Sequence, residues 1–267
     1  MDKFKIIEIA PLTRLNDIKL NVAEQKGWNF GSLSEPQIAQ LLSLALPETR
    51  KIKGALLFTG NGDDMFLNAS LRTSKNKKVH YTFPEINPIT VYYRSAVEHA
   101  IAAVNIRITL KSEEMAMSKS TFLEFANFYN EASQAVILLC TTIEGFINQL
   151  IPEDVSIDLG NGLKTKSELE FLDLNRKLKN LLPELYEINF FETHLTEFNQ
   201  ISLMIALRHD LIHLKTNIGE NGTAYQNIFK RLIDFEYQKA AASVFTFVDT
   251  FKTGYFVEVQ GEREEPK

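Results

Sequence analysis

The chain changes its hydrophobic pattern near residue 90, and this change constrains the fold more than any other feature. From Thr90 onward, apolar residues recur at intervals of three and four, which is the spacing of one helical face. The region before Thr90 holds half of the glycines and prolines, and its short apolar runs lie between turn residues. We therefore predict a mainly α protein, with a small α+β region at 1–90, an up-and-down helical bundle at 91–255 and a polar tail at 256–267.

Short elements are expected in the first 90 residues. Ser34 and Gln37 have the spacing of a capping box, so a helix of about three turns is predicted over 38–46. Turn residues then separate three strand-like runs, which favours a small antiparallel meander. The runs are GALLFT at 54–59, MFLNASLRT at 65–73 and KVHYTFPEI at 78–86.

Five helices are predicted after residue 90, on the basis of the helical spacing of their apolar residues. They cover 93–108, 122–150, 167–182, 193–215 and 224–251. Pro183 is expected to end the third helix, and Thr223 to cap the fifth. The stretch from Asp158 to Gly162 is typical of a turn between two very short strands.

Composition excludes several classes of protein. Cys140 is the only cysteine, so an internal disulfide and a cysteine-rich zinc site are excluded. The N-terminus lacks a signal-peptide pattern, and no apolar run approaches the ~18 residues of a membrane span. We therefore expect a cytoplasmic protein without a membrane anchor. The net charge of −5 argues against a uniformly basic nucleic-acid-binding surface but permits a local basic groove.

The fourth predicted helix carries a cation on its apolar side. On a helical wheel of about 100° per residue, Arg208 projects from the middle of an apolar face. That face consists of Ile201, Met204, Ile205, Leu211 and Ile212. A guanidinium keeps its proton and is costly to bury unpaired, so Arg208 requires a carboxylate, a set of carbonyl groups or an anionic ligand. His213 lies one turn further on, at the border of the polar face.

The second predicted helix offers a partner for this cation. Glu144 and Asn148 lie four residues apart, share one face and border the apolar stripe of their helix. If the two helices pack side by side, Glu144 is the expected partner of Arg208. The simplest interpretation is then a buried Arg–Glu bridge between two helices, with the histidines exposed.

The combination of these residues resembles the signature of HEPN domains (higher eukaryotes and prokaryotes nucleotide-binding). That signature is an Arg, four to six residues and a His, and here it reads LRHDLIHLK, with Arg208 and His213 and with the polar His209 after the Arg. The upstream IEGFINQLIP is similar to the family's helix with an acidic residue and an Asn. The resemblance covers about residues 91–255 and implies an α-helical bundle.

The resemblance also implies an activity, which is metal-independent endoribonuclease cleavage by attack of the 2′-hydroxyl. Two His213 side chains from a homodimer would divide the roles of general base and general acid. Arg208 would clamp the scissile phosphate and stabilise its growing charge. Asn148 or His209 could orient that phosphate, and Glu144 would hold Arg208 in place.

Further partners follow from the same resemblance. Many members of the family are toxins or anti-phage and stress effectors, so we expect an RNA substrate and a possible antitoxin or regulatory protein. No cofactor and no metal ion are implied. Asp210 lies inside the motif as a supporting residue. The candidates for contact with RNA phosphates are Lys215, Lys75, Lys77 and Lys78.

Two other functions fit the same residues. Some HEPN-like domains have lost catalysis, so an inactive scaffold that binds a nucleotide or a protein is one alternative. The second is a zinc hydrolase, because His209 and His213 have the i, i+4 spacing of a helical zinc motif. In that case Asp210 replaces the longer catalytic Glu of the motif, and Glu220 or Glu236 would have to supply the third ligand.

Overall fold

The structure is a computed structural model, and it describes residues 4–10, 12, 55–59, 65–72, 75, 80–84, 86–110, 119–160, 162–214 and 225–259. The described part is mostly helical, with a three-stranded sheet and a two-stranded sheet. The chain divides into two compact units, of which the smaller is Ile9–Pro88 and the larger joins Met1–Glu8 to Ile89–Lys267. The helix predicted at 38–46 lies outside the described residues.

The smaller unit contains a three-stranded antiparallel sheet in the order β1–β2–β3. The strands are β1 (Ala55–Thr59), β2 (Met65–Arg72) and β3 (His80–Pro84). Sequential strands are hydrogen-bonded neighbours, with Leu57 opposite Leu67 in the first pair. The predicted meander is therefore confirmed, and each strand lies within its predicted run.

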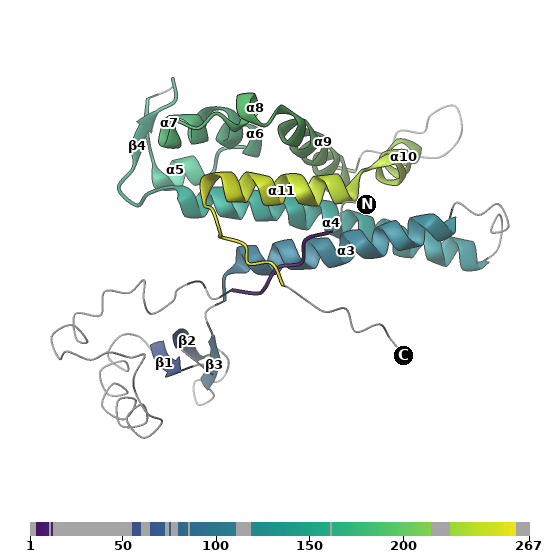
Figure 1. Ribbon diagram of the computed structural model, residues 1–267, viewed down its shortest axis with the longest axis horizontal. Coiled ribbons are helices and arrows are strands. Elements are labelled where there is room, and N and C mark those ends of the chain that lie inside the picture. The colour runs from purple at the N-terminus through teal and green to yellow at the C-terminus, as the bar shows by residue number, and fades with distance from the viewer. Residues whose placement is uncertain are drawn as a thin grey trace. The chain divides into compact units, whose positions relative to one another are not determined.

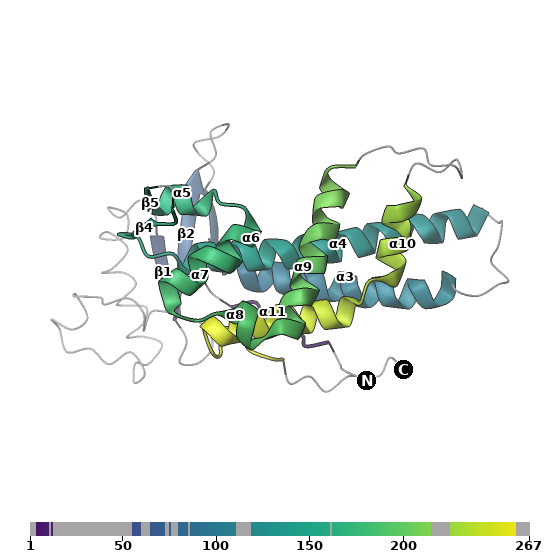
Figure 2. The same cartoon turned by 90° about the horizontal axis from the view of Figure 1, so that it is seen from above.

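Two long helices, α3 (Pro88–Leu110) and α4 (Lys119–Leu150), lie side by side in the larger unit (Figures 1 and 2). The helix α9 (Leu195–Ile212) crosses α4, and α11 (Tyr237–Phe251) packs against both α4 and α9. The shorter α10 (Gln226–Asp234) contacts α4 and α9. The first two predicted helices are thus confirmed as single elements.

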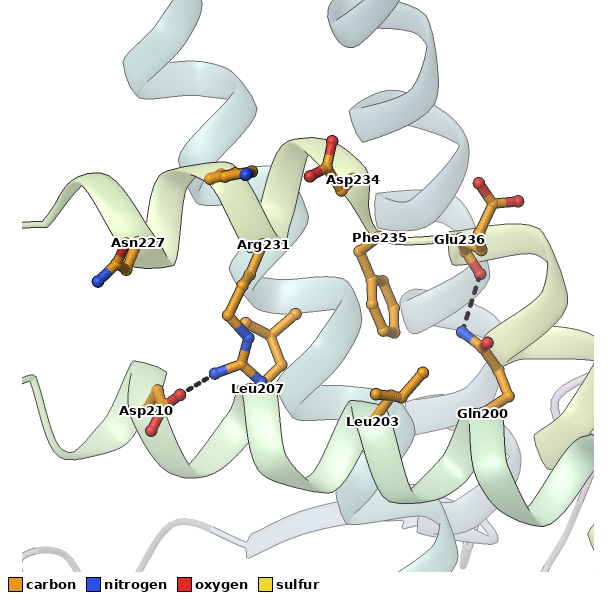
Figure 3. Close-up of a pocket in the computed structure, with 10 residues that line it drawn as sticks. Gln200, Leu203, Leu207, Asp210, Asn227, Arg231, Asp234, Phe235 and Glu236 are labelled. Carbon is orange, nitrogen blue, oxygen red and sulfur yellow. Dashed lines mark hydrogen bonds and ion pairs between the residues drawn. The ribbon is translucent and has the colours of Figure 1, made fainter.

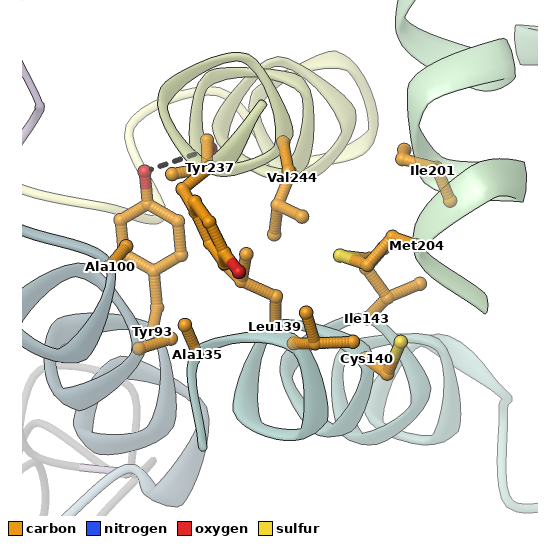
Figure 4. Close-up of a cluster of buried hydrophobic side chains, with 14 of the residues drawn as sticks. Tyr93, Ala100, Ala135, Leu139, Cys140, Ile143, Ile201, Met204, Tyr237 and Val244 are labelled. Atoms are coloured by element: carbon orange, nitrogen blue, oxygen red, sulfur yellow. Dashed lines mark hydrogen bonds between the residues drawn. The ribbon is translucent and has the colours of Figure 1, made fainter. Parts of the chain in front are cut away.

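Helices α3, α4, α9 and α11 share one apolar core (Figure 4). Two buried tyrosines satisfy their hydroxyls within it: Tyr93 donates to the carbonyl of Ala241 at 3.0 Å, and Tyr237 donates to that of Leu232 at 2.7 Å. Burial raises the pKa of both hydroxyls. The core side chains labelled beside them are Ala100, Ala135, Leu139, Cys140, Ile143, Ile201, Met204 and Val244.

The prediction of one continuous third helix over 167–182 is wrong. The segment forms α5 (Lys166–Glu170), α6 (Leu174–Arg176), the π-helical turn η4 (Lys177–Leu181) and α7 (Leu182–Tyr186). Pro183 does not end it, because Pro183 lies in the first turn of α7, where a missing N–H is tolerated. The chain leaves α7 at Glu187, which has a left-handed φ of 54°.

The short hairpin predicted before this segment is confirmed. Strands β4 (Ser156–Asp158) and β5 (Leu163–Thr165) pair in antiparallel fashion. The Asp158 carboxylate accepts hydrogen bonds from the N–H groups of Gly160 and Gly162, at 2.8 and 2.9 Å. Both glycines have a φ of 88°, a conformation that L side chains rarely adopt, so this turn requires glycine.

The fourth predicted helix is confirmed as a single element with shorter ends, whereas the fifth is interrupted. The fourth is preceded by the separate α8 (Phe190–Thr193), and α9 ends at Ile212. The fifth is broken at Phe235, whose ψ of 136° is extended. Nη1 of Arg107, on α3, donates to the carbonyls of both Ile233 and Phe235 at 2.8 Å. The break is therefore held by a residue on another helix, which local sequence patterns do not reveal.

The two ends of the larger unit meet in an extended pairing. Fully buried Ile7 forms an antiparallel bridge with Glu258. Phe256, in the segment predicted as a polar tail, is buried and stacks on Tyr93 with ring centroids 4.5 Å apart. Among the described helices, none combines the length and apolar character needed to cross a membrane.

Replacing Arg107 by Ala should lower the free energy of unfolding by about 2 kcal/mol, because two carbonyls lose a charged donor. Chemical denaturation monitored by circular dichroism measures the change. Arg94→Ala is the matched control on the same helix, since Arg94 forms an exposed pair with Glu98 as its only ion pair with the described residues and should cost less than about 0.5 kcal/mol. Equal effects of the two substitutions would contradict the role assigned to Arg107.

Candidate functional site

The last two turns of α9 place Arg208 between the core and the surface. The buried side chains of this helix are Phe198, Ile201, Met204, Leu207 and Leu211. Arg208 is half-buried, and its positive charge favours the thiolate form of Cys140 on α4. Burial nevertheless dominates and raises the pKa of Cys140 to about 12, so this thiol is not a nucleophile at neutral pH. The guanidinium therefore lies on the side of α9 that faces α4.

The predicted ion pair between Arg208 and Glu144 does not form. The Glu144 carboxylate lies 3.8 Å from the ammonium of Lys177 instead. Arg208 makes no hydrogen bond or ion pair with the residues that the structure describes. The anionic partner that a half-buried guanidinium calls for is thus left for another molecule or for a residue outside the described ranges.

Lys177 is the central residue that sequence reasoning missed. Its side chain is fully buried, at 0% exposure, and it begins the π-helical turn η4. Its ammonium donates to Oδ1 of Asn148 at 2.8 Å and to the carbonyl of Glu170 at 2.6 Å. Burial lowers the pKa of Lys177, and the charges of Glu144, Glu170 and Asp173 oppose that shift. The amide oxygen of Asn148 therefore accepts from a buried lysine.

A signal for Lys177 was present in the sequence. Leu174 and Leu181 lie three residues before and four residues after it, so Lys177 occupies an apolar helical face. The same argument that singles out Arg208 thus applies to Lys177. From the sequence alone, Arg208 and Lys177 are both possible partners of Glu144. Only the packing of the helices decides between them.

His209 and His213 form an exposed pair at the end of α9. Their ring centroids lie 4.7 Å apart, with the rings inclined at 49°. The helix ends at Ile212, earlier than predicted, and the His213 N–H still donates to the His209 carbonyl at 2.9 Å. Neither imidazole has a hydrogen bond or ion pair with the described part of the chain.

Asp210 belongs to a groove between α9 and α10 rather than to the histidine pair (Figure 3). Its carboxylate forms an ion pair with Arg231 of α10. Leu203, Leu207 and Phe235 supply the apolar part of the lining, and the cavity has a volume of about 680 Å³. Asp210 is therefore engaged by another cation and does not pair with Arg208.

The remaining candidate lysines lie in the smaller unit or outside the described residues. Lys75 is exposed in the smaller unit, while Lys77, Lys78 and Lys215 lie outside the residues whose side chains the structure describes. Among the described residues, no group of three or more His, Cys, Asp and Glu side chains could hold a metal ion. Of the two proposed third zinc ligands, Glu236 pairs with Lys239 at 3.4 Å, and Glu220 lies outside the described residues.

The end of α9 therefore presents one half-buried guanidinium and two exposed imidazoles, none of which has a hydrogen bond or ion pair with the described residues. The guanidinium of this set can bind an anion. Comparisons with protein-family models, with curated proteins and with solved structures found no match to this chain.

Replacing Lys177 by Met should lower the free energy of unfolding by about 2 kcal/mol, because Asn148 and a backbone carbonyl lose a buried donor. Denaturant titration at pH 7 measures the loss. The matched control is Lys179→Met, two residues away, where the lysine is exposed and the expected change stays within about 0.5 kcal/mol.

The pH dependence of the stability of the wild type and of Lys177→Met tests whether burial dominates at Lys177. The folded state lowers the pKa of Lys177, so the unfolded chain binds more protons in a window just below the ordinary lysine value of 10.5. Stability of the wild type relative to Lys177→Met should therefore rise with pH in that window. A difference that falls with rising pH would show that burial does not dominate at Lys177.

Proposed function

We propose that this protein is a metal-independent endoribonuclease of the HEPN type. The observation that carries the proposal is that Arg208 has no partner among the described residues while His213 is exposed at the end of the same helix. Both carboxylates expected near the motif are bound by other cations, Glu144 by Lys177 and Asp210 by Arg231. A guanidinium kept free in this way suits a phosphate as its partner.

The proposed reaction needs no metal ion. One His213 takes the proton of the 2′-hydroxyl, whose oxygen attacks the adjacent phosphorus. The bond from phosphorus to the 5′-oxygen breaks, and a second His213 donates a proton to that oxygen. The products are a 2′,3′-cyclic phosphate and a free 5′-hydroxyl. Arg208 binds the phosphate and stabilises the charge that develops on its oxygens.

A homodimer would bring two copies of the motif together, and the exposed positions of α9 support such an interface. The exposed positions of this helix carry no Asp, Glu, Lys or Arg. Leu195, Leu203 and Ile212 are among them, exposed by 54%, 58% and 46%. Depletion of charge with retained apolar side chains is typical of the centre of a protein interface.

The proposal includes a biological setting. The enzyme would act on RNA in the cytoplasm as a toxin or as an anti-phage or stress effector, under the control of an antitoxin or another regulatory protein. Lys75, Lys77, Lys78 and Lys215 remain candidates for additional phosphate contacts.

Arg208→Ala and His213→Ala should each lower the rate of RNA cleavage in EDTA at least a hundredfold, because each removes a group that acts in the transition state. The measurement is cleavage of a labelled RNA by the purified full chain. His213 is exposed, so its substitution should leave the melting temperature unchanged. His194→Ala, at the opposite end of α9, is the control and should remain active.

Two results would contradict the enzymatic proposal. If the wild type does not cut RNA and Arg208→Ala changes only stability, the inactive HEPN-like scaffold is the better description. If cleavage requires zinc and disappears in EDTA, the hydrolase with His209 and His213 as ligands takes its place.

Leu203→Glu should convert the dimer into a monomer and reduce RNA cleavage to the level of His213→Ala, because a carboxylate would be buried in the interface. Sedimentation velocity measures the mass. Phe171→Glu is the matched control, since Phe171 is 90% exposed on another part of the same unit and should leave the dimer intact. A monomeric wild type, or an active dimer of Leu203→Glu, would contradict the composite site.

A further inference from the structure

We propose that His209 and His213 together bind a divalent transition-metal ion such as zinc, and that the bound ion switches the site off. The binding stands on the geometry of one chain. The inhibitory effect rests on the proposed endoribonuclease function, because it requires His213 to act as a base or an acid.

The geometry of the pair suits chelation. Two nitrogens that bind one zinc ion at about 2.1 Å with tetrahedral angles lie about 3.4 Å apart. Rings with centroids 4.7 Å apart and inclined at 49° can present nitrogens at that separation. The hydrogen bond from the His213 N–H to the His209 carbonyl fixes the backbone of the two residues relative to each other, so little further ordering is needed.

The two imidazoles are also available to an ion. Both side chains are exposed, and neither is used by another group in the described part of the chain. They lie at the C-terminal end of α9, where the helix dipole favours a cation. The opposing charge is Arg208, which is half-buried on the side of α9 that faces α4.

The remaining coordination positions fall to water or to the second chain. Asp210 lies between the two histidines in sequence, but its carboxylate pairs with Arg231. No described carboxylate or thiol completes a site of three protein ligands within one chain. Within one chain the ion is therefore held by two imidazoles alone, which distinguishes this site from the closed ligand set of a structural zinc and favours a reversible role.

Chelation and proton transfer compete for the same atoms. A metal ion occupies the imidazole lone pair that would otherwise accept the proton of the 2′-hydroxyl. An ion on His213 also places positive charge close to the position proposed for the leaving oxygen but supplies no proton there. The ion would therefore inhibit cleavage, in contrast to the zinc hydrolase, in which the metal activates water.

Calorimetric titration of Zn²⁺ into protein freed of metal by EDTA and dialysis tests the binding. The wild type should bind Zn²⁺, and His209→Ala and His213→Ala should each weaken binding at least tenfold. His194→Ala should bind like the wild type, and Mg²⁺, which prefers oxygen ligands, should give no signal. Absence of binding to the wild type at millimolar Zn²⁺, or unchanged binding in both single variants, would overturn the site.

The rate of RNA cleavage at Zn²⁺ concentrations that saturate the site tests whether the bound ion inhibits the enzyme. The wild-type rate should fall at least tenfold and recover with EDTA, while His209→Ala should keep its own zinc-free rate. Saturation without loss of cleavage would overturn the inhibitory role and leave the metal site standing. If the wild type cuts no RNA even in EDTA, the inhibitory role falls together with the proposed function, and the calorimetry alone decides the metal site.

Discussion

The apolar stripe of α4 is the interaction on which the larger unit depends. Val136, Leu139, Ile143 and Ile147 are fully buried along it, and α9 and α11 both pack against this helix. Burial of each such side chain contributes about 1.5–3 kcal/mol, so this surface outweighs any single polar contact in the unit. This apolar packing determines which segments lie beside α4. The partners of the polar residues at its border, Glu144 and Asn148, therefore come from those segments.

Lys177 and Arg208 are the two cations that the sequence offers to Glu144, and the structure pairs the carboxylate with the lysine. The side chain of Lys177 is fully excluded from water, whereas that of Arg208 is half-buried and partly hydrated. An unpaired charge costs more where solvent cannot reach it, so the carboxylate stabilises the protein more beside the lysine than beside the arginine. The π-helical turn at Lys177 accompanies this arrangement, and such turns are frequent at functional sites.

Sequence periodicity predicted the elements that depend on local pattern. The spacing of apolar residues gave α3 and α4, and the turn residues gave the meander and the short β4–β5 hairpin. The predictions that failed share a cause, because each concerns a residue whose interaction partner is distant in sequence. The break between α10 and α11 is held by Arg107, more than 120 residues earlier, and the partner of Glu144 lies in a segment whose helical pieces read as one helix. The position of Arg208 on α9 could be predicted, but its lack of a partner could not.

The electrostatic state of the α9 end follows from two separate ion pairs. Glu144 is the carboxylate that the sequence predicts as the partner of Arg208, and Asp210 lies in the same motif as Arg208. The structure engages the first with Lys177 and the second with Arg231. Because each acid is matched by a cation from another segment, the charge of Arg208 remains uncompensated by the described residues. The half-exposed Asp210–Arg231 pair contributes little to stability by itself, so its main consequence is to hold the Asp210 carboxylate beside α10.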